Sequence, residues 1–343
     1  MIPRIAAEWL LRQAKDPLSS WAGVMTFGDF RVIYLGGMGR SGSTLAERLI
    51  GELPGVCVAG EVVHLWQRGV TDNEQCGCGA EFCRCEFWTA VADAAFGGWS
   101  KVDVRRIADL RASVDRTRLI PRLARRSMPE ALRRDLTEYT DYYSRLYRAI
   151  ARVSGCRTVV DSSKHASLAF CLSCRGDIDL RVIHVVRDSR AVAYSWTTLV
   201  PRPESGGSSY MTRYSPARAA AEWNTQNASL HLLAHGQTPV LRVRYEDLVG
   251  GVKPTMRLIS GFAGLPVDER GLAFVGGADR EQWAELRRAH TAAGNPMRFT
   301  TGKITIRPDD RWQTAMPGSQ RRTVTALTLP LLSRYGYLSG DTS

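Results

Sequence analysis

Four short runs of β-branched and aliphatic residues recur along the chain, and each is followed by polar or glycine-rich residues and then by a helical pattern. The runs are Arg31–Gly36, Thr158–Val160, Leu180–Val186 and Pro239–Val243. Apolar runs of this length are typical of strands buried on both faces. Strands that alternate with helices form a parallel sheet covered by helices on both sides. The chain is therefore predicted to be an α/β protein with its function at the carboxyl ends of the strands, where such sheets bind ligands.

The length of 343 residues, with 44% hydrophobic and 23% charged residues, fits one large α/β domain. We predict a single domain over residues 1–343. Within it, residues 62–155 form a mostly helical segment that is too long for a simple crossover. We interpret this segment as an insertion, or cap, that shapes a substrate site. Residues 201–215 are rich in Pro, Gly and Ser and are predicted to form a flexible loop and candidate lid.

The chain carries 46 Lys and Arg against 34 Asp and Glu, a net charge of +12 that attracts polyanions. Two basic stretches, Arg105–Arg134 and Arg280–Arg288, also contain acidic and apolar residues at helical spacing. We interpret both as solvated helix faces and predict no nucleic-acid partner. Residues 1–15 are predicted to form an amphipathic helix without a cleavage site. No run approaches the ~20 apolar residues of a membrane helix, so we expect no membrane span and a cytoplasmic location. The oligomeric state is not predicted.

Four of the eight cysteines, Cys76, Cys78, Cys83 and Cys85, fall within ten residues. These two Cys-x-Cys pairs are candidate ligands of a structural zinc. Ligand pairs are usually separated by two to four residues, however, so zinc is not the favoured interpretation. A disulfide and reduced thiols are the alternatives. No catalytic metal is predicted.

Residues Gly37–Thr44, Gly-Met-Gly-Arg-Ser-Gly-Ser-Thr, follow the first predicted strand and precede a helical pattern. In that context backbone N–H groups and the helix N-terminus bind phosphate. A P-loop for nucleoside triphosphates carries lysine directly after its second glycine, but Ser43 stands at that place. The positive charge comes instead from Arg40, two residues before Gly42. The loop is therefore predicted to bind a phosphate-bearing donor without Mg²⁺, and a P-loop nucleotide-dependent kinase is the alternative.

The string Arg40-Ser41-Gly42-Ser43-Thr44, preceded by Gly39, resembles the 5'-phosphosulfate loop of sulfotransferases that use PAPS (3'-phosphoadenosine 5'-phosphosulfate). The arginine in the loop and the later Gly60-Glu61 are more similar to the carbohydrate and tyrosyl-protein branches, and their bacterial relatives, than to the cytosolic phenol and steroid enzymes. The resemblance implies a P-loop-like parallel sheet, PAPS as co-substrate and PAP as product. The sequence departs from the cytosolic branch at Leu45, where that branch has a stacking tryptophan.

The resemblance extends to the other end of the donor. Arg187 directly follows the third run and Ser195 comes eight residues later, as in the family's 3'-phosphate site. A guanidinium binds a phosphate dianion through two hydrogen bonds, and a hydroxyl adds a third. By the same resemblance, Tyr245 lies beside the adenine, and Arg298, in a glycine-containing C-terminal loop, is a second contact to the 3'-phosphate.

The resemblance also suggests how the reaction is catalysed. Sulfuryl transfer is similar to phosphoryl transfer, in which positioning and charge stabilisation supply most of the catalysis. Arg40 is predicted to stabilise the leaving phosphate. Glu61 matches the glutamate base of the tyrosyl-protein branch. His165, by comparison with the cytosolic branch, is the competing base, and His64 is a further option.

Lys164 has two interpretations: a contact to the sulfuryl oxygens, or a surface lysine paired with Asp161. The predicted reaction transfers a sulfuryl group to a hydroxyl of a small-molecule acceptor, with an amine as the alternative. By analogy, the acceptor is expected to be a carbohydrate, a glycolipid or a natural product.

Overall fold

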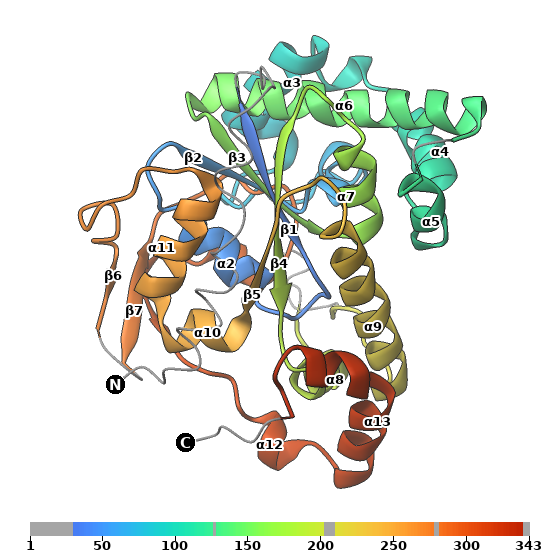
Figure 1. Ribbon diagram of the computed structural model, residues 1–343. Coiled ribbons are helices and arrows are strands. Elements are labelled where there is room, and N and C mark those ends of the chain that lie inside the picture. The colour runs from blue at the N-terminus through green and yellow to red at the C-terminus, as the bar shows by residue number, and fades with distance from the viewer. Residues whose placement is uncertain (1–29, 126–127, 202–209, 278–280, 339–343) are drawn as a thin grey trace.

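The computed structural model describes residues 30–125, 128–201, 210–277 and 281–338. Its centre is a five-stranded parallel sheet in the order β2-β3-β1-β4-β5 (Figure 1). The strands are β1 (Arg31–Gly36), β2 (Val56–Gly60), β3 (Thr158–Lys164), β4 (Asp179–Val186) and β5 (Val240–Arg244). The four apolar runs correspond to β1, β3, β4 and β5, so the predicted α/β class is confirmed.

Alternate residues of the strands point to opposite faces of this sheet. On β1, Val32 and Tyr34 face one core and Ile33 and Leu35 face the other, and all four are fully buried. The first core is covered by α3 (Glu86–Phe96), α4 (Val104–Val114), α5 (Ile120–Leu123), α6 (Glu130–Ser154), α7 (Ala166–Ser173) and α9 (Pro216–Leu233). The second is covered by α2 (Ser43–Ile50), α10 (Tyr245–Gly250) and α11 (Val252–Ala263). Two-sided burial explains why the strand sequences are apolar throughout.

Residues 62–155 connect the neighbouring parallel strands β2 and β3. They contain α3 to α6, a π-helical segment (Leu65–Thr71) and four 3-10 turns (Val62–His64, Phe82–Arg84, Trp99–Lys101 and Thr117–Leu119). Helix α6 lies across the end of the sheet in Figure 1 and buries Tyr139, Tyr143 and Tyr147, spaced at four residues, on one face. The described residues of this segment are mostly helical, and Arg105–Arg134 includes most of α4, all of α5 and the start of α6. Its separate role as a cap stays a prediction.

A second, antiparallel sheet was not predicted. It consists of β6 (Val275–Gly276), β7 (Gln282–Leu286) and β8 (Gly302–Ile306). The helix face expected within Arg280–Arg288 is therefore wrong. Gln282, Ala284 and Leu286 are buried, which is the two-residue period of a strand. The Gln282 amide also accepts from the Val252 N–H and donates to the Val249 carbonyl, which compensates its burial.

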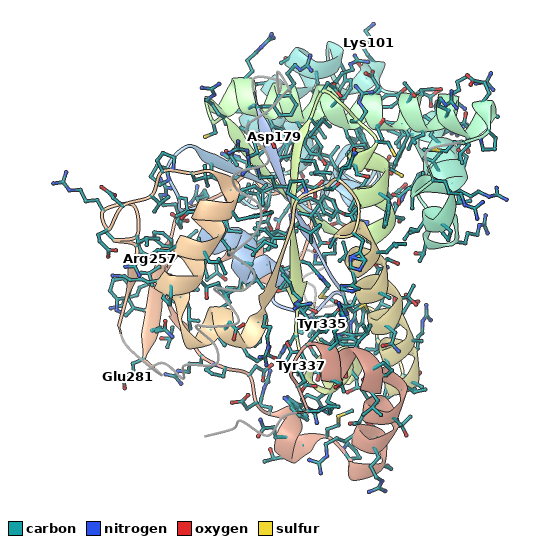
Figure 2. All side chains as sticks on the ribbon, viewed as in Figure 1. Lys101, Asp179, Arg257, Glu281, Tyr335 and Tyr337 are labelled. Carbon is teal, nitrogen blue, oxygen red and sulfur yellow. The ribbon has the colours of Figure 1, made fainter. Side chains whose placement is uncertain are left out.

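Helix α8 (Ser189–Thr197) directly follows β4. Two helices from the C-terminal part of the chain, α12 (Trp312–Ala315) and α13 (Gly318–Arg334), pack with it near the carboxyl end of β4. Asp179 and Tyr337, both labelled in Figure 2, mark opposite ends of the central sheet. The predicted helix over residues 1–15 and most of the candidate lid lie outside the described residues. Among the helices that are described, none is long and apolar enough to cross a membrane.

Candidate active site

The predicted phosphate loop joins β1 to α2 at the carboxyl edge of the sheet. Gly42 precedes α2 with φ of 87°, a left-handed conformation that favours glycine. A Cβ atom at Gly42 would lie 2.5 Å from the Tyr245 ring, and one at Gly37 would lie 2.3 Å from the Val185 carbonyl oxygen. The loop glycines are therefore required by backbone conformation and by close contact with the ends of β4 and β5.

Ser41 is 1% exposed, and its Oγ has no hydrogen-bond partner among the residues that the structure describes. A buried hydroxyl in that state costs about 1–3 kcal/mol. Ser43, the first residue of α2, is buried as well, whereas Thr44 is half-buried. The loop thus offers hydroxyl and backbone donors at a helix N-terminus, which is the chemistry of an anion site.

Arg187 joins the loop to the other strand ends. Its guanidinium donates to the Arg40 carbonyl at 3.3 Å and to the Asp309 carbonyl at 2.9 Å, and it pairs with the Asp309 carboxylate at 3.2 Å. The same group lies 4.4 Å from the centre of the Tyr245 ring. The structure therefore brings together the loop, Arg187 and Tyr245, three elements that the sequence placed on different strands.

Trp196 was missed by the sequence reasoning. Its indole N–H donates to the Gly39 carbonyl at 3.0 Å, its ring stacks on Tyr214 with centroids 4.2 Å apart, and the Arg40 guanidinium lies 5.4 Å from its centroid. Ser195 precedes it on α8 and is half-buried. An aromatic residue directly after the predicted Ser195 was the available signal.

Arg298 occupies a different environment from the one expected. It is 1% exposed, and its guanidinium donates to the carbonyls of Thr291 and Ala292. The guanidinium is therefore turned toward the protein interior, where these two carbonyls accept from it. We predicted that Arg298 contacts a 3'-phosphate. The burial of its guanidinium against backbone carbonyls does not support that prediction.

Ionisable side chains gather at the ends of β2 and β3. Glu61 accepts a hydrogen bond from the Lys164 ammonium. The Nε2 atom of His64 lies 3.7 Å from the other Glu61 oxygen, and the His64 and His165 rings meet edge to face at 5.8 Å. Lys164 is therefore not a surface lysine paired with Asp161, which is itself buried and accepts from Ser163 and Tyr147.

The electrostatics of this cluster follow from its burial. Burial alone raises the pKa of Glu61, but the neighbouring groups, Lys164 foremost with His64 and Arg68, together outweigh that effect, so the pKa lies below its ordinary value. Burial lowers the pKa of His64 to about 4 and also lowers the pKa of His165. Burial lowers the pKa of Arg40 as well, and the Glu61 carboxylate opposes that shift. At neutral pH the Glu61 carboxyl is therefore ionised and the imidazoles of His64 and His165 are neutral.

Residues 289–294, here called the backing segment, pack against Glu61 and the end of β2. The Glu61 N–H donates to the Ala293 carbonyl at 3.3 Å, and the Ala292 N–H donates to the Ala59 carbonyl at 2.9 Å. A Cβ atom at Gly294 would lie 3.1 Å from Glu61 Oε1. No local signal near Glu61 predicts this contact, because the segments meet only in the folded chain.

Glu47, on α2, also supports the strand ends. Its carboxylate accepts from the Gly60 N–H and from the Ser162 hydroxyl, both at 2.8 Å. Burial raises the pKa of this carboxyl to about 7. Glu47 thus connects the helix of the phosphate loop to both strands that carry the ionisable cluster.

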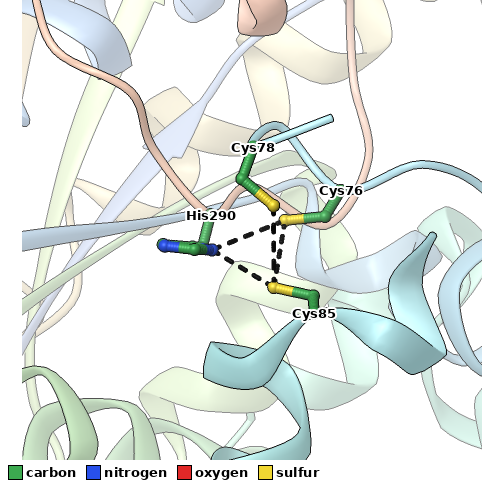
Figure 3. Close-up of side chains that lie close together, drawn as sticks. All are labelled: Cys76, Cys78, Cys85 and His290. Carbon is green, nitrogen blue, oxygen red and sulfur yellow. Dashed lines mark hydrogen bonds between the residues drawn. The ribbon is translucent and has the colours of Figure 1, made fainter. Parts of the chain in front are cut away.

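The cysteine cluster differs from the predicted one. All eight cysteines are free thiols, and Cys83 is exposed, so it does not join Cys76, Cys78 and Cys85. The fourth member is His290, from the backing segment, as Figure 3 shows. Cys83 faces away because it lies in the 3-10 turn before Cys85, and its N–H donates to Asn73.

A sequence model of the sulfotransferase family matches residues 33–269. No curated protein matches the sequence. Among solved structures, the chain is similar to the sulfotransferase domain of the olefin synthase from Synechococcus PCC 7002, at 21% identity and a TM-score of 0.48, covering 90% of this chain and 96% of that one.

Two further structures are similar. The sulfotransferase domain from the curacin biosynthetic pathway has 14% identity and a TM-score of 0.46, with 88% of this chain and 98% of that one covered. The sulfotransferase STF9 from Mycobacterium avium has 11% identity and a TM-score of 0.39, with coverages of 77% and 70%. The family match includes the carboxyl ends of all five strands, where the loop, the ionisable cluster, Arg187 and Tyr245 lie, and on that match the chain belongs to the sulfotransferase family and is a sulfotransferase enzyme.

Proposed function

We propose that the sulfuryl donor is PAPS and that the loop Gly37–Thr44 binds its 5'-phosphosulfate. The observation that carries this proposal is the buried Ser41 hydroxyl, which has no partner among the described residues. It lies between Arg40 and Gly42, both of which have positive φ. A phosphate oxygen in the loop would accept the Ser41 hydrogen bond and so remove the cost of its burial.

Arg187 and Ser195 are the proposed contacts to the 3'-phosphate, and Tyr245 is proposed to lie beside the adenine. The position of Arg187, between the loop and Tyr245, supports this arrangement. Its guanidinium pairs with Asp309 in this structure. A phosphate dianion would compete with that carboxylate for the same donors.

In the proposed reaction, an acceptor hydroxyl attacks the sulfur in line with the bond from sulfur to the bridging oxygen. That bond breaks as the new sulfur–oxygen bond forms, PAP leaves with the electron pair, and the acceptor proton passes to the Glu61 carboxylate. Arg40 stabilises the charge on the leaving phosphate, and Lys164 that on the sulfuryl oxygens. His165, with its neutral imidazole, is the alternative base.

The proposed acceptor is a hydroxyl of a carbohydrate, a glycolipid or a natural product. Residues 62–155 support a role in acceptor binding because they begin directly after Glu61 and end at the strand that carries Lys164. The nearer likeness to the carbohydrate and tyrosyl-protein branches, and a cytoplasmic location, stay predictions.

Thermal melting of the full chain with PAP and a metal chelator, or with ATP and Mg²⁺, tests the donor. PAP without metal is expected to raise the melting temperature, since a ligand at 100 times its Kd stabilises the folded state by about 2.7 kcal/mol. Ser41→Ala should reduce the shift. Ser113→Ala is the control, because that hydroxyl donates to Leu110 and Asp135 on the helical crossover. A shift with ATP and Mg²⁺ alone, or no shift with either ligand, would contradict the proposal that PAPS is the donor.

A further inference from the structure

We infer that Cys76, Cys78, Cys85 and His290 form a structural zinc site. Their four donor atoms all lie within 4.8 Å of one another. Figure 3 shows the three thiols and the imidazole turned toward one another, the thiols from the crossover between β2 and β3 and the imidazole from the backing segment. This inference stands apart from the proposed donor and base, because none of these four residues takes part in them.

The distances between the donor atoms fit a metal site rather than a disulfide. The sulfur of Cys85 lies 3.6 Å from that of Cys76 and 3.8 Å from that of Cys78. Nδ1 of His290 lies 3.2 Å from the Cys85 sulfur and 3.9 Å from the Cys76 sulfur. A disulfide requires about 2.05 Å. Zinc with bonds of about 2.3 Å to sulfur places two sulfurs of its tetrahedron about 3.8 Å apart.

The turn that carries Cys76 and Cys78 suits thiolate ligands. The Cys76 N–H donates to the Ala80 carbonyl and the Gly79 N–H to the Cys76 carbonyl, both at 2.8 Å, so the turn is closed by its own backbone. The Cys78 N–H also points at the Cys76 sulfur. Cys85 directly precedes α3, whose N-terminus favours a negative charge. N–H donors of this kind stabilise the charge of a thiolate-rich site and orient its ligands.

His290 is held in place from two sides. The ring of Phe87 stacks on the imidazole with centroids 5.0 Å apart and an interplanar angle of 24°. The Gly77 N–H donates to the Thr291 carbonyl at 2.9 Å. A Cβ atom at Gly77 would lie 2.3 Å from Thr291 Oγ1 and 2.7 Å from the Ala289 carbonyl oxygen. Only glycine lets the cysteine turn approach the backing segment this closely.

Four protein ligands leave no open coordination position, so the site is structural rather than catalytic. Zinc would join the cysteine turn to the backing segment, and the thiols would release their protons on binding. The backing segment in turn accepts the N–H of Glu61 through Ala293. Loss of the metal is therefore expected to lower the melting temperature and to loosen the backing segment behind Glu61.

Metal analysis of the purified full chain tests this inference. We expect about one zinc per chain in the wild type, and loss of zinc in Cys85→Ser and in His290→Ala. Cys83→Ser is the matched control, since Cys83 is an exposed thiol of the same loop and should leave zinc unchanged. His290→Cys supplies a fourth sulfur and should retain the metal. Co²⁺ loading of the wild type should give the intense visible absorption of a tetrahedral thiolate site.

The cobalt spectrum of the wild type keeps the test decisive even if a variant fails to fold. A wild-type chain that holds no zinc and gives no tetrahedral cobalt spectrum overturns the inference. So does a disulfide among the three thiols, located by mass analysis of the peptides of the non-reduced chain, or a Cys83→Ser variant that loses zinc as fully as Cys85→Ser. PAP melting on the same samples reports separately on the proposed donor.

Discussion

The ammonium of Lys164 changes the acid–base behaviour of Glu61. Because Glu61 is buried, its carboxyl would hold a proton more strongly than it does in water, yet the adjacent ammonium keeps it ionised. A general base must be ionised to accept a proton, so the lysine extends the pH range in which Glu61 can act. The cost is a weaker base, since a lowered pKa also lowers the affinity for the acceptor proton.

Lys164→Met is therefore expected to shift the acidic limb of the pH–rate profile. Activity is lost as pH falls through the pKa of the base. Without the ammonium, burial raises the pKa of Glu61, so the limb moves to higher pH. The profile of sulfuryl transfer to a synthetic acceptor measures this shift. Lys303→Met, which removes an exposed lysine that lies over Trp283, is the control. An unmoved limb in Lys164→Met would transfer the role of base away from Glu61.

Single residues also show where sequence reasoning stops. Arg187 and Tyr245 lie beside the loop that carries Ser41, because parallel strands bring their carboxyl ends to one edge. His290 could not be assigned to the cysteine cluster, since it is 205 positions from Cys85 and only tertiary packing joins them. Arg298 lies in the expected stretch of chain, but sequence position does not reveal that its guanidinium turns inward to backbone carbonyls.

At the level of elements, the strand–loop–helix unit over β1 and α2 depends on two separate properties of Gly42. The residue has positive φ, and it packs against the Tyr245 ring. Gly55, in the turn between α2 and β2, has a similar φ of 75°, but a Cβ atom there would meet nothing within 4 Å. A substitution at Gly55 therefore tests backbone strain alone, whereas a substitution at Gly42 tests the same strain together with the contact to Tyr245.

Gly42→Ala is expected to abolish the melting shift produced by PAP and to lower stability by more than Gly55→Ala does. Backbone strain alone costs about 1–2 kcal/mol for an alanine in the left-handed region, and both variants bear it. The clash with Tyr245 belongs to Gly42→Ala alone. Melting of both variants with and without PAP measures the difference. If Gly42→Ala and Gly55→Ala lose equal stability and show equal PAP shifts, the contact between position 42 and Tyr245 has no effect, which contradicts the prediction.

The elements themselves were predictable to different degrees. Strands buried on both faces show continuous apolar runs, which predicted β1, β3, β4 and β5, and the shorter apolar run Val56–Ala59 also predicts a strand, which is β2. β7 is short, contains Gln282 and Glu285, and is followed by two arginines, so its alternating burial was hidden by charges at helical spacing. β8 likewise alternates exposed and partly buried residues over only five positions. Short edge sheets of this kind depend on tertiary contacts more than on their own sequence.

For the whole molecule, Glu47 links folding stability to pH. It is 2% exposed and lies where α2 meets the ends of β2 and β3. Its raised pKa means that the folded chain holds this proton up to about pH 7, whereas the unfolded chain releases it at the ordinary pKa of a glutamate. Stability from this group is complete below the unfolded pKa and is lost as pH rises through about 7.

Glu47→Gln should reduce the fall in melting temperature between pH 5 and pH 8. The amide oxygen can accept from the Gly60 N–H, and the amide nitrogen can donate to the Ser162 hydroxyl, so both contacts have a neutral equivalent. Asp161, whose pKa is raised to about 6 by burial, contributes in the same direction and remains in both proteins. Calorimetric melting at several pH values gives the comparison, and identical pH slopes in the two proteins would rule out the effect.

The backing segment has a consequence for the order in which the chain becomes functional. During synthesis, the phosphate loop, Glu61, Lys164, Arg187 and Tyr245 all emerge before residue 289. The central sheet is then complete, but the carbonyl of Ala293 that accepts the Glu61 N–H has yet to be made. A nascent chain at that stage contains every proposed donor contact, while the candidate base Glu61 still lacks the segment that packs behind it. The part of the site around Glu61 can therefore be completed only when the last sixth of the polypeptide has been synthesised. The residues proposed to bind PAPS are all present well before that point.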